Sequence, residues 1–346
     1  MYLISILQAP TNIIPTKKEG DKMRFVLRKV TTLLVTLFLI SVCAFLAFQI
    51  IPGDPAALQL GVDATPESLE ALRVELGLDR PMPIRYGEWM RDLFVGDMGQ
   101  SYAHGVSVRE LLGDRLLVTG SLMAFGFLLT VVVALPIGLL TAERTGEAAY
   151  RKGGRIWNPP LRGATATISQ VVMAVPPLFL GLILTFVFGS MLRVFTPSDF
   201  VSFREDAGAY LLYMLFPALA IALPKAAMTI RLIHSAVRDE MGRDYVRTAI
   251  SRGDTPRGIL VRHMLPNIAV PVVTFLTLTL IMMITDTIVV EQIFSITGAG
   301  RLLVSAIGAR DYPVVQALVV IIAALVMTLH TITDLICRAI DPRITL

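Results

Sequence analysis

Histidine and cysteine, two residue types that often carry catalysis or bind metals, are few in this sequence and widely separated. The four histidines stand at His104, His234, His263 and His330, without the spacing of metal ligands or of a Ser-His-Asp triad. No stretch has the glycine-rich pattern ending in Gly-Lys-Ser/Thr that holds the phosphates of ATP. We therefore expect no enzyme activity, no metal site and no cofactor bound by this chain itself.

Asp286 is the acidic residue whose charge is hardest to place. It lies deep in an apolar segment, with no basic residue beside it in the sequence. A charge at the centre of a bilayer costs at least about 2.5 to 3.5 kcal/mol on insertion scales. Asp286 must therefore face a polar cavity or a partner group.

A second polar feature is a basic island between two apolar segments, residues 240–266. Gly253 can take the left-handed conformation that ends one short helix, and Thr255 is suited to cap the next. We expect the second helix to end at Leu265, because the residue before a proline, here Pro266, is disfavoured in the helical conformation. These signals predict a helix-turn-helix elbow.

The first helix of this elbow has four residues at three- and four-residue spacing, which should place them on one face: Tyr245, Thr248, Ala249 and Arg252. A rigid, basic elbow at the end of membrane helices is suited to receive a push from a soluble partner and to pass it into the membrane. The alternative is a solvated loop whose arginines only fix the topology.

The island resembles the conserved cytoplasmic loop of ABC-importer permeases, in which Glu-Ala-Ala is followed by a glycine and then by Ile-x-Leu-Pro. The matching positions are Arg247-Thr248-Ala249, Gly253, His263 in place of the isoleucine, and Leu265-Pro266. This variant is similar to the oligopeptide, dipeptide and nickel branch of the family. Leu78-Asp79-Arg80-Pro81, the Tyr86/Trp89 pair and the tail Asp341-Pro342-Arg343-Ile344 extend the resemblance over nearly all of 23–346.

The composition agrees with an integral membrane protein. The chain has 346 residues, of which 54% are hydrophobic and 17% charged, and its mean hydropathy is +0.68. Apolar runs reach the roughly 20 residues that span a hydrocarbon core, and each should be helical. We expect an all-α fold with six transmembrane helices at about 30–51, 117–141, 166–192, 210–230, 268–290 and 314–336.

The predicted topology has both termini in the cytoplasm. Residues 1–22 form an N-terminal extension, 23–346 the permease domain, and 52–116 a large external loop. Lys and Arg are more numerous in the cytoplasmic segments, where we count Lys225 at the inner end of the fourth span. The net charge of +4 is spread over loops, which indicates topology and not nucleic-acid binding.

The resemblance implies the type I ABC importer permease fold in a bacterial inner membrane. It also implies a second, similar permease, two cytoplasmic ATPases that bind ATP and Mg, and an external substrate-binding protein. Peptides are the substrate expected first, with nickel chelates, glutathione or another small solute as alternatives. An ion-coupled secondary transporter, with Asp286 as its coupling site, is the rival from another class.

Two places in the spans are then candidates for the translocation pathway. Pro176 and Pro177 must bend or break the third span, and the freed carbonyls need protein or water partners. The pair therefore either faces the bundle interior or a pathway, or it only kinks an ordinary helix. Asp286 either contacts a peptide's amino terminus or a cation in the pathway, or it is protonated or hydrogen-bonded to the partner permease.

Overall fold

The computed structural model describes residues 16–50, 55–60, 64–151, 159–195 and 200–341. Across these ranges the regular structure is helical, with one isolated bridge between Gln100 and Ser107. The all-α prediction is confirmed. Residues 1–15 of the predicted extension lie outside the described ranges, and the rest of it forms the first turns of α1 (Thr16–Ile50).

Five helical runs are long and apolar enough to cross a bilayer. They are Val26–Ala47 of α1, Val108–Ala142 of α5 (Val108–Arg151), α8 (Ala207–Met241), Pro256–Ile293 with α11 (Leu265–Ile293), and α13 (Tyr312–Ile340). A bent pair, Thr167–Ala174 with Pro177–Met191, completes the six expected spans if it is counted as one. The helices exceed the predicted limits, because hydropathy marks the lipid-level residues and not the polar turns that continue the same helix.

The third span is broken where the sequence predicts it. α6 (Pro159–Ala174) ends before Pro176, whose φ of −61° and ψ of 148° are extended. α7 (Pro177–Leu184) and a π-helical segment, η2 (Thr185–Met191), leave at 94° to α6. Pro177 has no N–H to continue the first helix, and it restricts the residue before it, so a new helix starts there.

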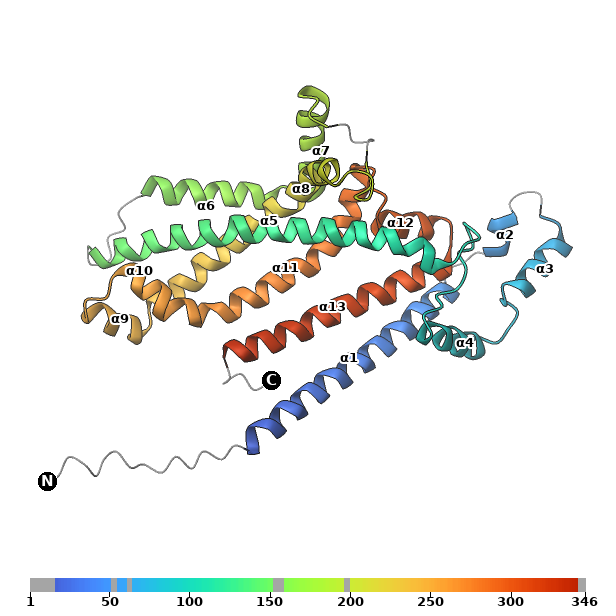
Figure 1. The fold of residues 1–346 in the computed structure, drawn as a ribbon, viewed down its shortest axis with the longest axis horizontal. Coiled ribbons are helices and arrows are strands. Elements are labelled where there is room, and N and C mark those ends of the chain that lie inside the picture. Colours follow the sequence, from blue (N-terminus) through green and yellow to red (C-terminus); the bar gives the residue numbers. More distant parts are fainter. Residues whose placement is uncertain (1–15, 51–54, 61–63, 152–158, 196–199, 342–346) are drawn as a thin grey trace.

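The long helices lie lengthwise beside one another in Figure 1. α5 packs along α8, α8 along α11, and α13 against both α11 and α1. Lys29 of α1 and Asp334 of α13 are 2.6 Å apart (Nζ to Oδ2). Two short helices gather at one end of the bundle, α9 (Asp244–Ser251) and α10 (Pro256–Gly258). At the other end lie α2 (Pro55–Leu60), α3 (Pro66–Glu75), α4 (Met82–Phe94) and α12 (Ala299–Gly308).

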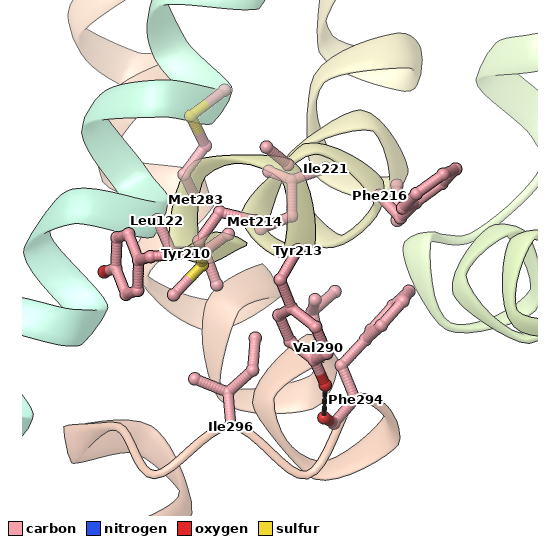
Figure 2. Packing of buried hydrophobic residues seen from close by; sticks show 12 residues of the cluster. Leu122, Tyr210, Tyr213, Met214, Phe216, Ile221, Met283, Val290, Phe294 and Ile296 are labelled. Atoms are coloured by element: carbon pink, nitrogen blue, oxygen red, sulfur yellow. Dashed lines mark hydrogen bonds between the residues drawn. The ribbon is translucent and has the colours of Figure 1, made fainter. Parts of the chain in front are cut away.

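A buried apolar cluster fixes α8 against the C-terminal end of α11 (Figure 2). The hydroxyl of Tyr213 donates a hydrogen bond to the carbonyl oxygen of Phe294, which ties the two helices together inside the cluster. Phe195 stacks on Phe216 with their ring centroids 4.4 Å apart. Aromatic packing of this kind adds to the burial of apolar area, so this end of the bundle is well ordered.

Glu291 holds α12 in place at the outer end of α11. Its buried carboxylate accepts hydrogen bonds from Thr119 Oγ1 and from the backbone nitrogen of Arg301, the latter at 2.8 Å. A Cβ atom on Gly298 would lie 2.2 Å from Glu291 Oε1, so only glycine fits there. The carboxylate stabilises the first turn of α12, which agrees with a structural role for Glu291.

Candidate functional site

The predicted elbow connects α8 to α11 at the end of the bundle away from α12. Gly253 ends α9 with a φ of +85°, a backbone conformation that favours glycine, and Asp254 N donates to Ala249 O at 3.2 Å. Thr255 Oγ1 then accepts a hydrogen bond from Gly258 N at 3.1 Å as the N-cap of α10. These contacts confirm the predicted turn between two short helices.

The second helix of the elbow does not end at Leu265, and that expectation is wrong. Leu265 is helical, with a φ of −56° and a ψ of −42°, and it begins α11. A π-helical segment, η3 (Ile259–Met264), joins α10 to α11 without a break. Pro266 falls in the first turn of α11, where a helix needs no hydrogen bond from the backbone nitrogen. The elbow is therefore a continuous lead into the membrane helix.

The four residues predicted to share one face of α9 are divided between two environments. Ala249 is buried together with Val246, while Thr248 and Arg252 are exposed and Tyr245 is half-buried. A short helix next to the bundle must bury its apolar positions against the chain's own core. The outer surface of α9 and its C-cap therefore consists of Asp244, Arg247, Thr248, Ser251 and Arg252, with Arg247 Nη1 3.7 Å from Asp244 Oδ1.

The inner surface of the elbow packs on the ends of three long helices. Its apolar residues form one cluster with members of α5, α8 and α11: Ala142, Ile233, Val237, Val246, Ala249, Ile259, Leu260, Met264 and Ile268. A Cβ atom on Gly138 of α5 would lie 2.8 Å from Ile233 Cδ1, so α5 and α8 are in close contact here. The cluster therefore connects the elbow to all three helices by close packing.

Polar contacts hold the elbow's shape from within. Tyr245 donates a hydrogen bond to Glu240 at the end of α8. Burial, and then this hydrogen bond, raise the pKa of Tyr245 above its ordinary value, so the phenol stays protonated. His263 Nε2 lies 3.3 Å from Asp254 Oδ2 and links η3 to the turn. His263, which replaces the isoleucine of the family pattern, thus contacts the Gly253 turn directly.

Asp286 has a partner that the sequence interpretation missed. Lys225 Nζ of α8 lies 2.8 Å from Asp286 Oδ2, and the side chains are 11% and 17% exposed. The two oppositely charged groups are close enough for an ion pair, although the geometry at Oδ2 is not that of a hydrogen bond. Lys225, which the sequence analysis placed at the inner end of the fourth span, lies near the middle of α8, which continues to Met241. The two residues are far apart in the sequence, so no local pattern links them. The available signal was the helical periodicity of α8, which assigns Lys225 to one of its faces.

The structure does not unite the elbow with the candidate pathway residues. Asp286 lies on α11 far along the chain from the elbow, and Pro176 and Pro177 lie at the break before α7. A Cβ atom on Gly181 of α7 would lie 3.3 Å from side-chain atoms of Ile293 and Phe294, so α7 packs on the outer end of α11. Two separate regions result, a basic elbow and a membrane-embedded charged pair.

Comparison with known families agrees with these observations. Residues 134–346 match the model of the binding-protein-dependent transport system inner membrane component, and residues 22–123 match the N-terminal model of such membrane components. The chain belongs to this family. The permease is thus a multi-pass inner-membrane protein of an ABC transport system and is not itself catalytic. The match to 134–346 includes the whole elbow and the Lys225–Asp286 pair.

Individual relatives extend along nearly the whole permease. A "probable peptide ABC transporter permease protein" of Sinorhizobium fredii is 32% identical over 320 residues, which cover 92% of this chain and 98% of the relative. A glutathione transport system permease protein of Pectobacterium atrosepticum is 30% identical, with 93% and 99% coverage. The MetNI methionine ABC transporter has a similar fold, with a TM-score of 0.51 at 19% identity, over 67% of this chain and 96% of that one.

Proposed function

We propose that this permease forms half of the membrane pathway of an ATP-driven peptide importer, and that a cytoplasmic ATPase docks on its elbow. The observation that carries the proposal is the elbow's two-sided construction. Its apolar side is packed on α5, α8 and α11, and its other side presents Arg247, Thr248 and Arg252 to solvent. A surface of that kind is free to bind a soluble protein while remaining fixed to the membrane helices.

The docked ATPase drives transport by moving the elbow. When two ATPases close on ATP, they draw together the elbows of two similar permeases, and the pathway changes from inward-facing to outward-facing. ATP shifts this equilibrium only if the ATPases bind it more tightly in one conformation than in the other. The continuous run from α10 through η3 into α11 gives the motion a direct route into the membrane.

This assembly has two permeases, two ATPases and an external binding protein, with both termini of the chain in the cytoplasm. Basic residues support this orientation. The elbow carries several exposed arginines, and Lys29, near the start of α1, pairs with Asp334 near the C-terminal end of α13. The external binding protein delivers the substrate. Peptides are the proposed cargo, since a peptide permease is similar along 92% of the chain, and glutathione is the second candidate.

We place the pathway along the exposed face of α11 beside Asp286. Met282 is 47% exposed and Thr285 is also exposed, so this face is covered by nothing in the described part of the chain. The break at Pro176 and Pro177 brings α7 against the outer end of the same helix. Lys225 and Asp286 then offer a cation and an anion to the two ends of a peptide.

The test of the docking site compares two glycine substitutions in the full chain, expressed with its partner subunits. In Gly253→Pro, proline cannot adopt the φ of +85°, and the donor that reaches Ile250 O is lost. The matched control is Gly105→Pro, at an outer turn where φ is +65° and the N–H donates to Ser101 O. A Cβ atom added to either glycine would meet no neighbour within 4 Å, so the comparison isolates the backbone.

The measurement is the amount of ATPase that co-purifies from membranes in mild detergent. We expect ATPase with the natural chain and with Gly105→Pro, and little or none with Gly253→Pro. Equal ATPase recovery with all three chains would show that the elbow is not the docking site.

A further inference from the structure

Helix α4 contacts α1 within the apolar run of α1. Tyr86 of α4 forms a hydrogen bond with Ser41 of α1, 2.8 Å between the hydroxyl oxygens. The Tyr86 ring also lies against Phe45, with centroids 5.4 Å apart. Both α1 residues belong to the apolar run Val26–Ala47 of α1, a helix that continues to Ile50. At 1.5 Å per residue, Ser41 lies about 9 Å from Ala47 along the helix.

A row of aromatic contacts fixes α4 at this depth. Trp89 packs on Phe45 with a centroid distance of 6.1 Å, and the Arg85 guanidinium carbon lies 5.9 Å from the centre of the same ring. Figure 1 shows α4 beside the outer end of α1. Tyr and Trp are the residues that membrane proteins concentrate at the boundary between lipid and water.

Apolar side chains are exposed on α4 and at its C-terminal end, beside charged ones. Phe94 is 83% exposed, Val95 77%, Ile84 53% and Met82 49%. Nearby on α1, Leu39 and Leu46 are exposed as well, as expected for a helix that faces lipid. The apolar surface of α4 therefore continues that of a membrane span.

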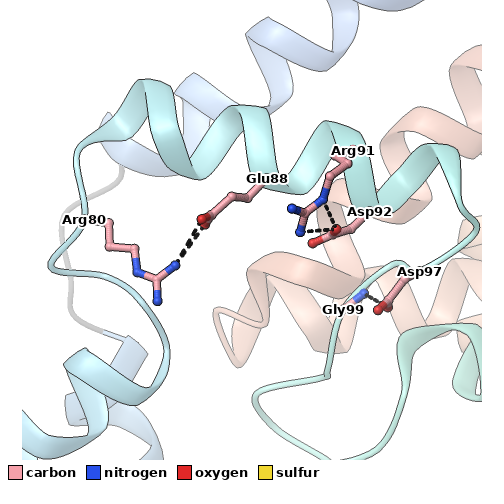
Figure 3. A network of polar contacts seen from close by, with 6 residues as sticks. All are labelled: Arg80, Glu88, Arg91, Asp92, Asp97 and Gly99. Atoms are coloured by element: carbon pink, nitrogen blue, oxygen red, sulfur yellow. Dashed lines mark hydrogen bonds and ion pairs between the residues drawn. The ribbon is translucent and has the colours of Figure 1, made fainter.

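The charges of α4 are arranged in local pairs (Figure 3). Arg80 Nη1 lies 3.1 Å from Glu88 Oε1, and Arg91 Nη2 lies 2.8 Å from Asp92 Oδ1. Pairing within one short segment lowers the cost of holding these groups near lipid headgroups. It also leaves little unpaired charge on this segment for an oppositely charged protein surface.

We propose that α4 is an interfacial helix whose Phe94–Val95 end is inserted in the outer leaflet of the bilayer. The occupant of its exposed apolar surface is lipid. This places part of the predicted external loop in the membrane, where it anchors the outer end of α1. The proposal depends on α1 being a span and is independent of the transported solute and of ATPase docking.

The experiment measures the surroundings of a nitroxide label in the full permease complex, reconstituted in phosphatidylcholine and phosphatidylglycerol vesicles. The chain carries Cys43→Ser and Cys337→Ala, with one new cysteine at Phe94→Cys or, in a second variant, at Val95→Cys. The matched control is Glu70→Cys on α3, an exposed position of the same outer region whose side chain is 67% exposed. Each label is tested for collision with oxygen, which concentrates in lipid, and with a water-soluble nickel chelate.

We expect the ratio of oxygen to nickel collisions to be several-fold higher at positions 94 and 95 than at position 70. Equal ratios at all three positions would overturn the proposal. A label at 94 that is exposed to nickel in vesicles, and becomes shielded only when the external binding protein is added, would also overturn it. Uptake by the assembled complex checks that each labelled chain is folded, because none of the three positions lies at the proposed pathway or elbow.

Discussion

Removing one member of the Lys225–Asp286 pair should destabilise the permease far more than removing both. At 2.8 Å, two unit charges attract by about 6 kcal/mol with an effective dielectric constant of about 20. Desolvation of the two ions offsets most of that attraction, at several kcal/mol for each ion. Asp286→Leu or Lys225→Met alone leaves a buried, unpaired charge and should cost about 3–5 kcal/mol. The double variant should lie within about 1 kcal/mol of the natural chain, since well-packed apolar replacements of buried pairs are often neutral.

The assay is the free energy of unfolding of all four chains, from titration with sodium dodecyl sulfate in mixed micelles. The loss of stability in the double variant should be smaller than the sum of the two single losses, because the second substitution restores the stability that the first one removes. Two single effects that add to within about 0.5 kcal/mol in the double variant would show that the groups do not interact. Peptide uptake by the double variant then separates two roles. Restored stability without uptake indicates contact with the substrate, and restored uptake indicates a purely structural pair.

Three further predictions concern the elbow and the outer loop. Gly298→Ala should markedly lower thermal stability in detergent, because its Cβ would lie 2.2 Å from Glu291 Oε1. An unchanged melting temperature would contradict the close approach of Gly298 to the Glu291 carboxylate. Thr255→Ala should cost about 1 kcal/mol as the loss of an N-cap, measured by the same unfolding titration, whereas Thr255→Ser should cost much less. The raised pKa of Tyr245 contributes stability that is complete below the ordinary value of 10.0 and is lost as pH rises through the raised value. Alkaline unfolding should therefore be less steep in Tyr245→Phe, and identical pH profiles would contradict a raised pKa of Tyr245.

Local chemistry allowed much of the elbow to be predicted from the sequence. Gly253 and Thr255 act through their own backbone and nearest neighbours, so their roles follow from residue type alone. Leu265 was predicted wrongly because the preference of a residue before proline is weak beside the continuous packing of η3 and α11. The burial of Ala249 also depends on where the bundle lies, which three- and four-residue spacing does not reveal.

The partner of Asp286 could not be predicted from the sequence, because it depends on the packing of two helices. Asp286 was correctly expected to need a partner, because a buried charge is costly in any arrangement. Its partner, Lys225, lies on another helix, and only the packing of α8 on α11 brings them together. The position of α4 along α1 could not be predicted for the same reason, since Tyr86 and Ser41 are distant in the chain. Single-sequence patterns determine which elements form, and packing determines which of their faces meet.

Uptake by purified complexes in vesicles tests the central claim most directly. The permease, its partner permease and the ATPases are reconstituted with ATP and Mg enclosed, a short peptide and its binding protein outside, and ionophores present to abolish ion gradients. The account predicts uptake that requires enclosed ATP and is lost in Gly253→Pro but not in Gly105→Pro. Uptake that stops with ionophores and proceeds without ATP would contradict it and would favour a transporter driven by an ion gradient.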